Sequence, residues 1–538
     1  MRTLVINLTR FGDLLQTQPA LSGLAAQGHE VGLVCLGNFA EAAGLLRDVD
    51  RVLPFPAARL LARLDADWRQ AVLGFRDFVA EARERFAPQQ VVNLTPSVSA
   101  RLLARALGGE TLGFGIDEQG FNADASSWAA FLQIASASRG ASPFNVADLF
   151  RRSAGLGREG NGFALAAVPA EARARARSLL DPAALPEARG FTAVQLGASE
   201  DKRRWPVAHF AGLARLLWER ERRVPVLVGA AGEAGLGERF SAAAPGLPVV
   251  NLLGRTALPE LAAVLSCCDL LATNDTGTMH LAAGLGVPVL AVFLATAQPW
   301  DTGPCREGCV CLEPDLPCHP CGFHRECAHD LRCRTAVTPE AAFGFASRLL
   351  AGHGAWPEAA SGTRAWLTRR DGEGFMDLAG LSGHEDSDRV RWIRVQRHIY
   401  RRFLDGGDME EGAASPAGPG QAFAAPLARV LAEAADLLHL LAQQGGLLCR
   451  APRPALKAKF LANWQRLSDA LQAEDGLCVL GLLWAFESQQ RGRDMGALLS
   501  LIGRYQSLVA ALRGILSAGT ELEYGSAGPI PRENRTPT

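Results

Sequence analysis

Short apolar runs recur along the first part of the chain, and each is followed by a segment whose apolar residues have helical spacing. The first of these runs lie at residues 4–8, 31–36, 91–94 and 111–115, and a helical pattern at 16–26 follows the first run. Strands that alternate with helices form parallel sheets covered by helices. The rhythm therefore predicts an α/β fold for this part of the chain.

The same rhythm begins again after an interruption. Residues 170–180 have a helical pattern, and residues 181–190 contain two prolines and are typical of a linker. New apolar runs follow at residues 192–196, 224–228, 249–253, 270–272 and 288–293. The pattern predicts two α/β domains, at residues 1–180 and 190–352. Because such sheets bind ligands at the carboxyl ends of their strands, we expect a site in a cleft between the two domains.

The composition changes after residue 353. Segments 353–363 and 405–420 are rich in Gly, Ala, Ser and Pro and indicate linkers. Helical patterns lie at residues 390–403, 427–443, 457–472 and 494–517, and no strand pattern is convincing. We therefore expect an all-helical extension over residues 364–520 and a disordered tail over 521–538.

Length and charge limit the classes of function. The chain has 538 residues, enough for three or four domains of roughly 150 residues. Its formal net charge of -1 lacks the basic excess of a nucleic-acid-binding protein, so we expect no nucleic-acid partner. The N-terminus has no secretory signal pattern, and no stretch of about 18 uncharged apolar residues is present. A cytoplasmic location, or one at the inner face of the membrane, is expected.

Three segments that join a strand to a helix contain chemically active side chains. The first, TRFGDLLQTQPA, covers residues 9–20 and includes Asp13, which could be a general base toward a hydroxyl or merely a helix N-cap. The second, QLGASEDKRRWP, covers residues 195–206 and could hold a phosphate or be a solvated basic turn.

The third such segment, TNDTGTMHLAAG, covers residues 273–284. Its residues 276–278 would present backbone N–H groups at a helix start, an arrangement that suits a pyrophosphate. The alternative is an ordinary capped helix whose His280 is satisfied in the core.

Together these segments resemble the ADP-heptose:lipopolysaccharide heptosyltransferase family, glycosyltransferase family 9. The similar pieces are GDLLQTQPAL near the N-terminus, the GAS…RRWP…HF stretch, VLVGAAGE, and above all NDTGTMHLAAGLGVPVLAVF. The resemblance covers residues 1 to about 350. It implies a GT-B fold of two Rossmann-like domains and an inverting, metal-independent sugar transfer from ADP-heptose to a lipopolysaccharide-core or other glycan acceptor.

The resemblance also implies roles for individual residues. Asp13 matches the general base that acts on the acceptor hydroxyl. The expected donor-binding residues are Ser199, Lys202 and Arg203 near the phosphates, Glu233 near the nucleoside, and Asp275, Thr276, Gly277 and His280 in the donor loop. The family usually has a lysine two positions before the Trp205-Pro206 pair; this chain has Arg203 there and Lys202 one place earlier.

Seven of the twelve cysteines lie within residues 305–333. Cys318 and Cys321 form a CxxC pair, and Cys327 and Cys333 follow, so these four are candidate ligands of a structural zinc ion or iron–sulfur cluster. The alternative is a set of reduced or partly paired thiols. No cofactor is expected for catalysis.

Other interpretations of the chain remain open. The basic amphipathic segment 392–403 could dock on an anionic membrane, which would suit a lipid-linked acceptor, or pack as an ordinary helix. The function could also be that of a nucleotide-sugar epimerase with the GT-B fold, or of a non-catalytic scaffold that binds partners through the cysteine-rich insert and the helical extension.

Overall fold

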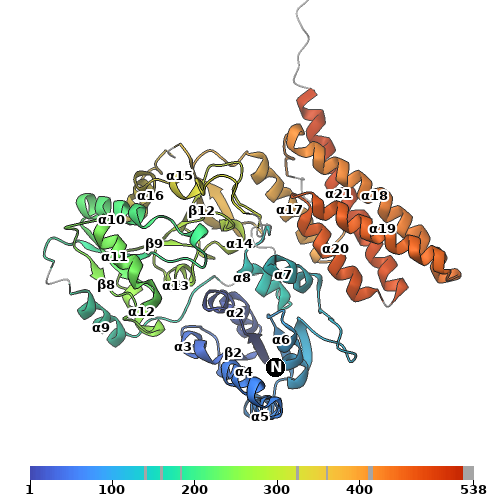
Figure 1. The fold of residues 1–538 in the computed structure, drawn as a ribbon, viewed down its shortest axis with the longest axis horizontal. Helices are drawn as coiled ribbons and strands as arrows, with labels where there is room; N and C mark the ends of the chain where they lie inside the picture. Colours follow the sequence, from blue (N-terminus) through green and yellow to red (C-terminus); the bar gives the residue numbers. More distant parts are fainter. Residues whose placement is uncertain are drawn as a thin grey trace, which may run out of the picture. The chain divides into compact units, whose positions relative to one another are not determined.

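The computed structural model describes residues 1–137, 142–157, 162–181, 185–322, 326–358, 361–409, 416–492 and 494–524. The chain forms two compact units, residues 1–384 and 385–538. In Figure 1 the first unit runs from blue to yellow, and the helices of the second unit are orange to red.

The first half of unit 1 contains a five-stranded parallel sheet in the order β3-β2-β1-β4-β5. Its strands are β1 (Arg2–Asn7), β2 (Glu30–Leu36), β3 (Arg51–Phe55), β4 (Gln90–Asn93) and β5 (Glu110–Gly113). Thr3–Asn7 of β1 are buried, as expected for the central strand of a sheet with helices on both faces. The four predicted strands are present, and β3, which contains a proline, was missed.

Helices cover this sheet and connect its strands. They are α1 (Phe11–Gln16), α2 (Gln18–Ala26), α3 (Ala40–Ala43), α4 (Ala57–Ala66), α5 (Trp68–Phe86), α6 (Val98–Leu107), α7 (Ser127–Ala137) and α8 (Val146–Ser153). One hydrophobic core lies between the sheet and α5 and α6; it includes Leu4, Val34, Phe78 and Leu103. The predicted helix over residues 16–26 is divided at Thr17, because α1 ends there and α2 begins with Pro19 in its first turn.

The second half of unit 1 contains an eight-stranded sheet in the order β13-β12-β11-β10-β9-β6-β7-β8. Strands β6 to β11 are parallel: β6 (Gly190–Gln195), β7 (Arg223–Val228), β8 (Val250–Asn251), β9 (Leu270–Asn274), β10 (Val289–Val292) and β11 (Val310–Pro314). The first five of these correspond to the predicted strands. The helices of this second half are α9 (Ala170–Leu180), α10 (Val207–Glu221), α11 (Ala234–Ala243), α12 (Leu258–Leu265), α13 (Gly277–Leu285), α14 (Pro299–Thr302), α15 (Cys333–Ala336) and α16 (Pro339–Ala351).

The predicted boundary between the second domain and the helical extension is wrong. Residues 363–380 are not helical: β12 (Thr363–Arg370) pairs antiparallel with β11, and β13 (Met376–Gly380) pairs with β12. Trp366 is fully buried and donates its indole N–H to Oε2 of the buried Glu313 at 2.7 Å. The cysteine-rich segment supplies β11, so the sheet needs β12 to cover an edge that would otherwise be exposed.

Unit 2 is helical. It consists of α17 (Asp388–Leu404), α18 (Gln421–Arg450), α19 (Pro454–Ala473), α20 (Cys478–Arg491) and α21 (Met495–Tyr524). α18 packs against both α19 and α21. The sequence predicted all of these except α20. Of the predicted disordered tail, residues 521–524 belong to α21, and residues 525–538 lie outside the described part of the chain.

The proposed membrane-docking helix at residues 392–403 is instead a packed helix. Its apolar residues, which include Trp392, Val395, Ile399 and Phe403, are at most 7% exposed. Trp392 donates a hydrogen bond to the carbonyl oxygen of Gly476 at 3.0 Å, within the same unit. The face that would contact lipid is therefore the face that holds unit 2 together.

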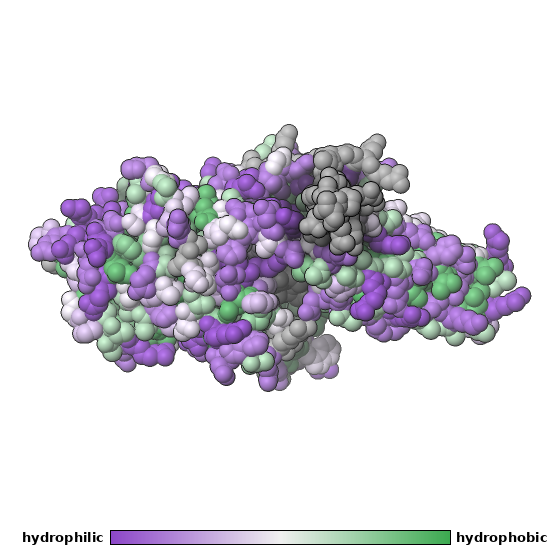
Figure 2. Space-filling model, turned by 90° about the horizontal axis from the view of Figure 1, so that it is seen from above, coloured by the Kyte–Doolittle hydropathy of each residue, from purple (hydrophilic) through white to green (hydrophobic). Residues whose placement is uncertain are grey.

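One segment of α21, Met495–Ser517, is long and apolar enough to cross a membrane, with a mean hydropathy of 1.3. It contains Arg504 and Arg513, and its apolar residues such as Leu501 and Leu508 are buried against other helices of the unit. Arg504 donates to the carbonyl oxygen of Phe403 in α17 at 2.7 Å. These contacts join α21 to the other helices of the unit, and 39% of its apolar window is buried. Apolar side chains are also exposed on this unit: Leu440 and Leu447 of α18 and Leu461 of α19 are 41% to 52% exposed. Figure 2 shows green, hydrophobic areas among the purple ones at its right end.

Candidate active site

The order of the strands places the three motif segments where ligands bind in such folds. In the first sheet the strand order reverses between β1 and β4, and the segment with Asp13 directly follows β1. In the second sheet the order reverses between β6 and β9, and the other two segments follow these two strands. Crevices at such switch points, at the carboxyl ends of the strands, are the usual ligand sites.

Asp13 lies in the first turn of α1 and is half-buried. The alternative that it is the N-cap is wrong, because Arg10 occupies the N-cap position. The peptide around Asp13 is held in place: its carbonyl oxygen accepts hydrogen bonds from Thr17 Oγ1 at 3.2 Å and from Asn7 Nδ2 at 3.4 Å. The carboxylate is therefore carried on a short, anchored helix directly after the central strand.

The first segment contacts the third through two glycines. A Cβ placed on Gly12 would lie 3.1 Å from the Cα of Gly277 and 3.3 Å from Cδ2 of His280. A Cβ on Gly277 would lie 2.6 Å from Cδ1 of Phe11. Helices α1 and α13 thus meet at their N-terminal ends because neither has a side chain at the point of contact. This contact brings Asp13 and the predicted donor loop into one site, with the buried His280 beside Gly12.

The loop after β6 directs Arg203 toward the loop after β9. Arg203 is buried, donates from Nε to Thr296 Oγ1 at 2.7 Å, and has Nη1 at 4.0 Å from Oδ2 of Asp275. Its Nη2 is 3.6 Å from Oε1 of Glu200. Lys202 instead pairs with Glu200, with Nζ at 3.1 Å from Oε2, and is about one third exposed. Of the two candidate cations, Arg203 is the one that the fold brings to the donor loop.

Ser199 is exposed at the tip of the same loop. The loop itself is fixed by Asn274 at the end of β9. Asn274 Nδ2 donates to the carbonyl oxygens of Leu196 and Gly197 at 3.2 and 2.8 Å, and its Oδ1 accepts from the N–H of Trp205 at 2.8 Å. The position of Ser199 and Arg203 is therefore set by a side chain of the neighbouring strand.

Thr276 is the N-cap residue of α13, but its side chain does not cap the helix. Its hydroxyl pairs with the hydroxyl of Thr273 at 3.1 Å. Asp275, which precedes it, accepts a hydrogen bond from Thr302 Oγ1 of α14 at 3.3 Å. A helix start without a side-chain cap, with Arg203 nearby, has the electrostatic character of an anion site.

Glu233 is joined to α13 by a relay of side chains. Its two carboxylate oxygens accept from Nε2 of Gln195 at 3.2 and 3.0 Å, and Oε2 also accepts from the N–H of Ala230 at 2.8 Å. Gln195 Oε1 in turn accepts from Thr278 Oγ1 at 3.2 Å. The carboxylate lies against Gly197 and Gly229, which leave room for it. The loops after β6, β7 and β9 are thus connected at one edge of the sheet.

Several residues of this site were not assigned a role from the sequence: Gln195, Asn274, Thr278, Thr296 and Thr302. Gln195 and Asn274 are polar residues that end apolar strands, which is a signal that could have identified them. Thr296 and Thr302 follow β10 at the same edge, in a stretch where the strand–helix pattern is interrupted.

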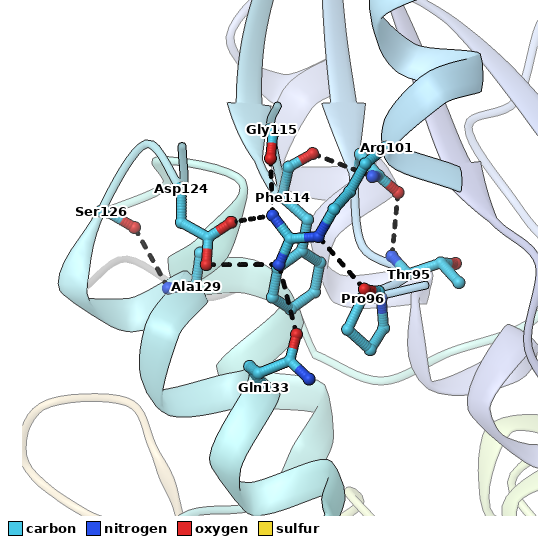
Figure 3. Close-up of polar contacts among 10 residues, drawn as sticks. Thr95, Pro96, Arg101, Phe114, Gly115, Asp124, Ser126, Ala129 and Gln133 are labelled. Carbon is cyan, nitrogen blue, oxygen red and sulfur yellow. Dashed lines mark hydrogen bonds and ion pairs between the residues drawn. The ribbon is translucent and has the colours of Figure 1, made fainter. Parts of the chain in front are cut away.

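The carboxyl ends of β4 and β5 are held by a buried arginine (Figure 3). Arg101 of α6 donates to the carbonyl oxygens of Pro96 and Gly115 at 3.1 and 2.6 Å, and to Gln133 Oε1 at 3.2 Å. It also forms an ion pair with Asp124, and both side chains are 1% exposed. The ring of Phe114 lies beneath the guanidinium at 5.0 Å. This network orders the loop after β5.

None of the twelve cysteines forms a disulfide. Burial, followed by the nearby thiols of Cys333, Cys318 and Cys327, raises the pKa of Cys321, so the four candidate ligands are neighbours. Among the described residues, however, no three His, Cys, Asp or Glu side chains are arranged to hold a metal ion. The proposed zinc or iron–sulfur site therefore has no support in the geometry.

Comparison with known proteins agrees with the motifs. Residues 146–331 match the model of glycosyltransferase family 9 (heptosyltransferase). Lipopolysaccharide heptosyltransferase 1 of Pseudomonas aeruginosa is 38% identical over 117 residues, which are 22% of this chain and 32% of that protein. Lipopolysaccharide heptosyltransferase 1 of Escherichia coli K12 is 27% identical over 326 residues, which are 58% of this chain and 94% of that protein.

The first relatives are matched over about a third of their own length. Among solved structures, E. coli ADP-heptose lps heptosyltransferase II aligns with a TM-score of 0.49 at 18% identity, over 65% of this chain and 99% of that one. The two sheets of unit 1, with the motif segments at the carboxyl ends of their parallel strands, form the predicted GT-B architecture. The motifs and the family model thus agree on one similarity: residues 146–331 match glycosyltransferase family 9, the heptosyltransferase family.

Proposed function

We propose that this chain is an inverting glycosyltransferase that moves a heptose from ADP-heptose to a lipopolysaccharide-core or related glycan acceptor. The observation that carries the proposal is the contact of α1 with α13 at Gly12 and Gly277, which unites Asp13 with Arg203, Asp275 and the start of α13. The match of residues 146–331 to the heptosyltransferase family model supports the class of donor and acceptor.

In this proposal Asp13 takes the proton from the acceptor hydroxyl as its oxygen attacks the anomeric carbon of the heptose. The bond between that carbon and the diphosphate breaks on the opposite face, which inverts the configuration, and ADP leaves with the bonding electron pair.

The negative charge that develops on the leaving ADP has a matching environment. The buried Arg203 and the uncapped N–H groups at the start of α13 are preorganised to stabilise it, so the step needs no metal ion. Lys202 could contribute after it leaves Glu200, and Ser199 could donate its exposed hydroxyl to a phosphate oxygen.

Glu233 is the proposed acceptor for hydroxyls of the donor nucleoside. Its carboxylate is held by Gln195 and by the N–H of Ala230, so its direction is set before the donor binds. His280, buried beside Gly12, and Asp275 complete the proposed donor side. With a lipid-linked acceptor, the enzyme would act at the cytoplasmic face of the inner membrane.

The test is ADP release by the purified chain with ADP-heptose and a lipopolysaccharide-core acceptor. Asp13→Asn keeps the shape of the side chain and removes the base, so we expect turnover to fall about 100- to 10,000-fold while ADP binding measured by calorimetry stays unchanged. Glu171→Gln is a matched control, because Glu171 also lies in the first turn of a helix and is exposed.

Unchanged turnover in Asp13→Asn would refute the assignment of the base. Turnover of UDP-sugars without any acceptor would favour an epimerase. A folded chain that binds no nucleotide and turns over no donor would contradict the transferase and favour the scaffold.

A further inference from the structure

Helix α4 and the start of α5 expose an unusual set of apolar side chains. None of the residues of α4 is buried. Leu61, Leu64, Trp68, Val72 and Leu73 are between 38% and 63% exposed. We call these five residues the α4–α5 patch. Isolated exposed apolar residues are ordinary, whereas a group that includes a tryptophan indicates a surface that binds something.

The patch lies on two consecutive helices that pack against each other, α4 and α5. Leu61 and Leu64 are three residues apart on α4, and Trp68 and Val72 are four apart on α5, so each pair lies on one helix face. The two helices pack together at Gly74, where an added Cβ would lie 2.9 Å from Cδ2 of Leu60. Leu60 therefore faces the partner helix, and the next residue, Leu61, points to solvent.

Arginines accompany the apolar residues. The guanidinium of Arg69 lies 5.0 Å from the centre of the Trp68 ring. Within the described part of the chain, no carboxylate pairs with Arg59, Arg63 or Arg69. The acidic neighbour Asp67 accepts the N–H of Arg69 at 3.0 Å as the N-cap of α5, which engages its charge with the helix dipole. Segments that lie in a membrane interface are typically composed of tryptophan and leucine together with arginines that have no carboxylate partner.

The topology places the patch at the edge of the sheet that carries Asp13. α4 begins directly after β3, at the carboxyl end of an edge strand. α5 then connects to β4, which is also parallel, so α5 runs from the carboxyl edge back toward the amino edge. Its first residues, Trp68 to Leu73, therefore lie on the carboxyl side, as does the segment after β1.

We propose that the α4–α5 patch docks this protein on an anionic lipid bilayer. The apolar side chains enter the interface, and Arg59, Arg63 and Arg69 contact lipid phosphates. The location suits the proposed function, because a lipid-linked acceptor would then reach Asp13 from the membrane. That argument rests on the proposed function, whereas lipid binding itself requires neither donor nor acceptor.

A second copy of the chain fits the patch less well. Stable protein interfaces use about 20 to 30 residues on each side. The patch offers five apolar residues on two helices, with unpaired arginines that would face the same arginines of a symmetric partner.

The test is cosedimentation of the full chain with vesicles in which about one lipid in three is phosphatidylglycerol and the rest is phosphatidylcholine. Leu61→Gln, Leu64→Gln and Trp68→Gln are combined in one variant, since these positions are exposed and glutamine is a good helix former. The matched control combines Leu440→Gln, Leu447→Gln and Leu461→Gln, which are 41% to 52% exposed in unit 2.

We expect the α4–α5 variant to bind at least ten-fold more weakly and the control to bind like the unmodified chain. Arg59→Gln with Arg63→Gln should weaken binding to these vesicles by roughly five-fold per arginine and have little effect with pure phosphatidylcholine.

Equal binding by the α4–α5 variant, or no binding by the unmodified chain, would overturn the proposal. So would concentration-dependent dimerisation without lipid that the α4–α5 variant abolishes in analytical ultracentrifugation. ADP release from a soluble acceptor, measured on the same variants, tests the proposed function separately and should be unchanged.

Discussion

Arg101 and Asp124 illustrate how a single buried pair organises the first sheet. The guanidinium has acceptors from three segments of the chain and the face of Phe114 beneath it, and neither charged side chain reaches water. Removal of one partner leaves the other charge buried without compensation, which is costly.

We therefore expect Arg101→Met to lower the free energy of unfolding by about 3–5 kcal/mol, measured by urea denaturation. Asp124→Leu alone should cost a similar amount, and the double variant should cost clearly less than the sum. Strict additivity would contradict the coupling of the two side chains.

A second prediction for a single residue concerns Gln195 and the affinity for ADP. Its amide connects Glu233 to Thr278, so Gln195→Leu removes all three hydrogen bonds of the amide and leaves the carboxylate with the N–H of Ala230. We expect ADP affinity to fall about ten-fold in calorimetry, because Glu233 loses its fixed direction, while stability changes by only about 1–2 kcal/mol. An unchanged affinity would separate Glu233 from nucleotide binding.

At the scale of elements, the approach of α1 to α13 depends on two residues without side chains. Gly277→Ala would bring a Cβ within 2.6 Å of the Phe11 ring and so push the two helices apart. We expect turnover to fall about 100-fold, since a displacement of the order of 1 Å is enough to misplace a catalytic group.

The melting temperature of Gly277→Ala should differ by only a few degrees from that of the unmodified chain. Gly235→Ala serves as the control. Gly235 lies in α11, where an added Cβ meets nothing within 4 Å. A variant Gly277→Ala with full activity would show that the contact does not position Asp13.

The helices of unit 2 enclose Tyr400 and Tyr505, two of the chain's three tyrosines. Tyr505 donates to Oε2 of the buried Glu487 at 2.9 Å. Burial, and for Tyr505 also the charge of Glu487, raises the pKa of both phenols well above the ordinary value of 10.

The folded state therefore holds these two protons more tightly than the unfolded state. The resulting stability is fully present below about pH 10 and is lost as the pH rises above that value. We expect phenolate absorbance to increase in one cooperative step that coincides with loss of helical circular dichroism. Tyr400→Phe combined with Tyr505→Phe should shift helix loss to higher pH, and a gradual titration in the unmodified folded protein would contradict the burial.

At the scale of the whole molecule, the position of the boundary between the units can be tested by truncation. The contacts place it after His384, not at residues 352–364 as the sequence suggested. A chain that ends at residue 362 lacks β12 and β13 and leaves Glu313 buried without the indole of Trp366.

We expect the 1–384 chain to melt cooperatively and to bind ADP like the full chain. The 1–362 chain should lose at least about 3 kcal/mol of stability or fail to fold, because the loss of the fully buried side chain of Trp366 by itself costs about that much. Equal stability of the two truncations, measured by thermal denaturation, would show that β12 and β13 are dispensable.

Periodicity and motif spacing were sufficient for the α/β class, for nine of the strands and for most helices, because a strand buried on both faces must be a short apolar run. They also located Asp13, Arg203 and the start of α13. They missed β3, β11, β12 and β13. The sequences of β12 and β13, TRAWLTRR and MDLAG, lack the continuous apolar run of a strand that is buried on both faces. What identifies β12 as a strand is its pairing with β11, a long-range contact.

Local sequence thus determined the position of nine strands, which turns contain polar groups, and which family the chain resembles, since each follows from neighbouring residues. Only the tertiary structure decided that Gly12 touches Gly277, that Arg203 and not Lys202 approaches Asp275, and that segment 392–403 is buried while α4 is exposed. These outcomes depend on how separate elements pack. An amphipathic helix has the same sequence pattern whether its apolar face meets another helix, solvent or lipid.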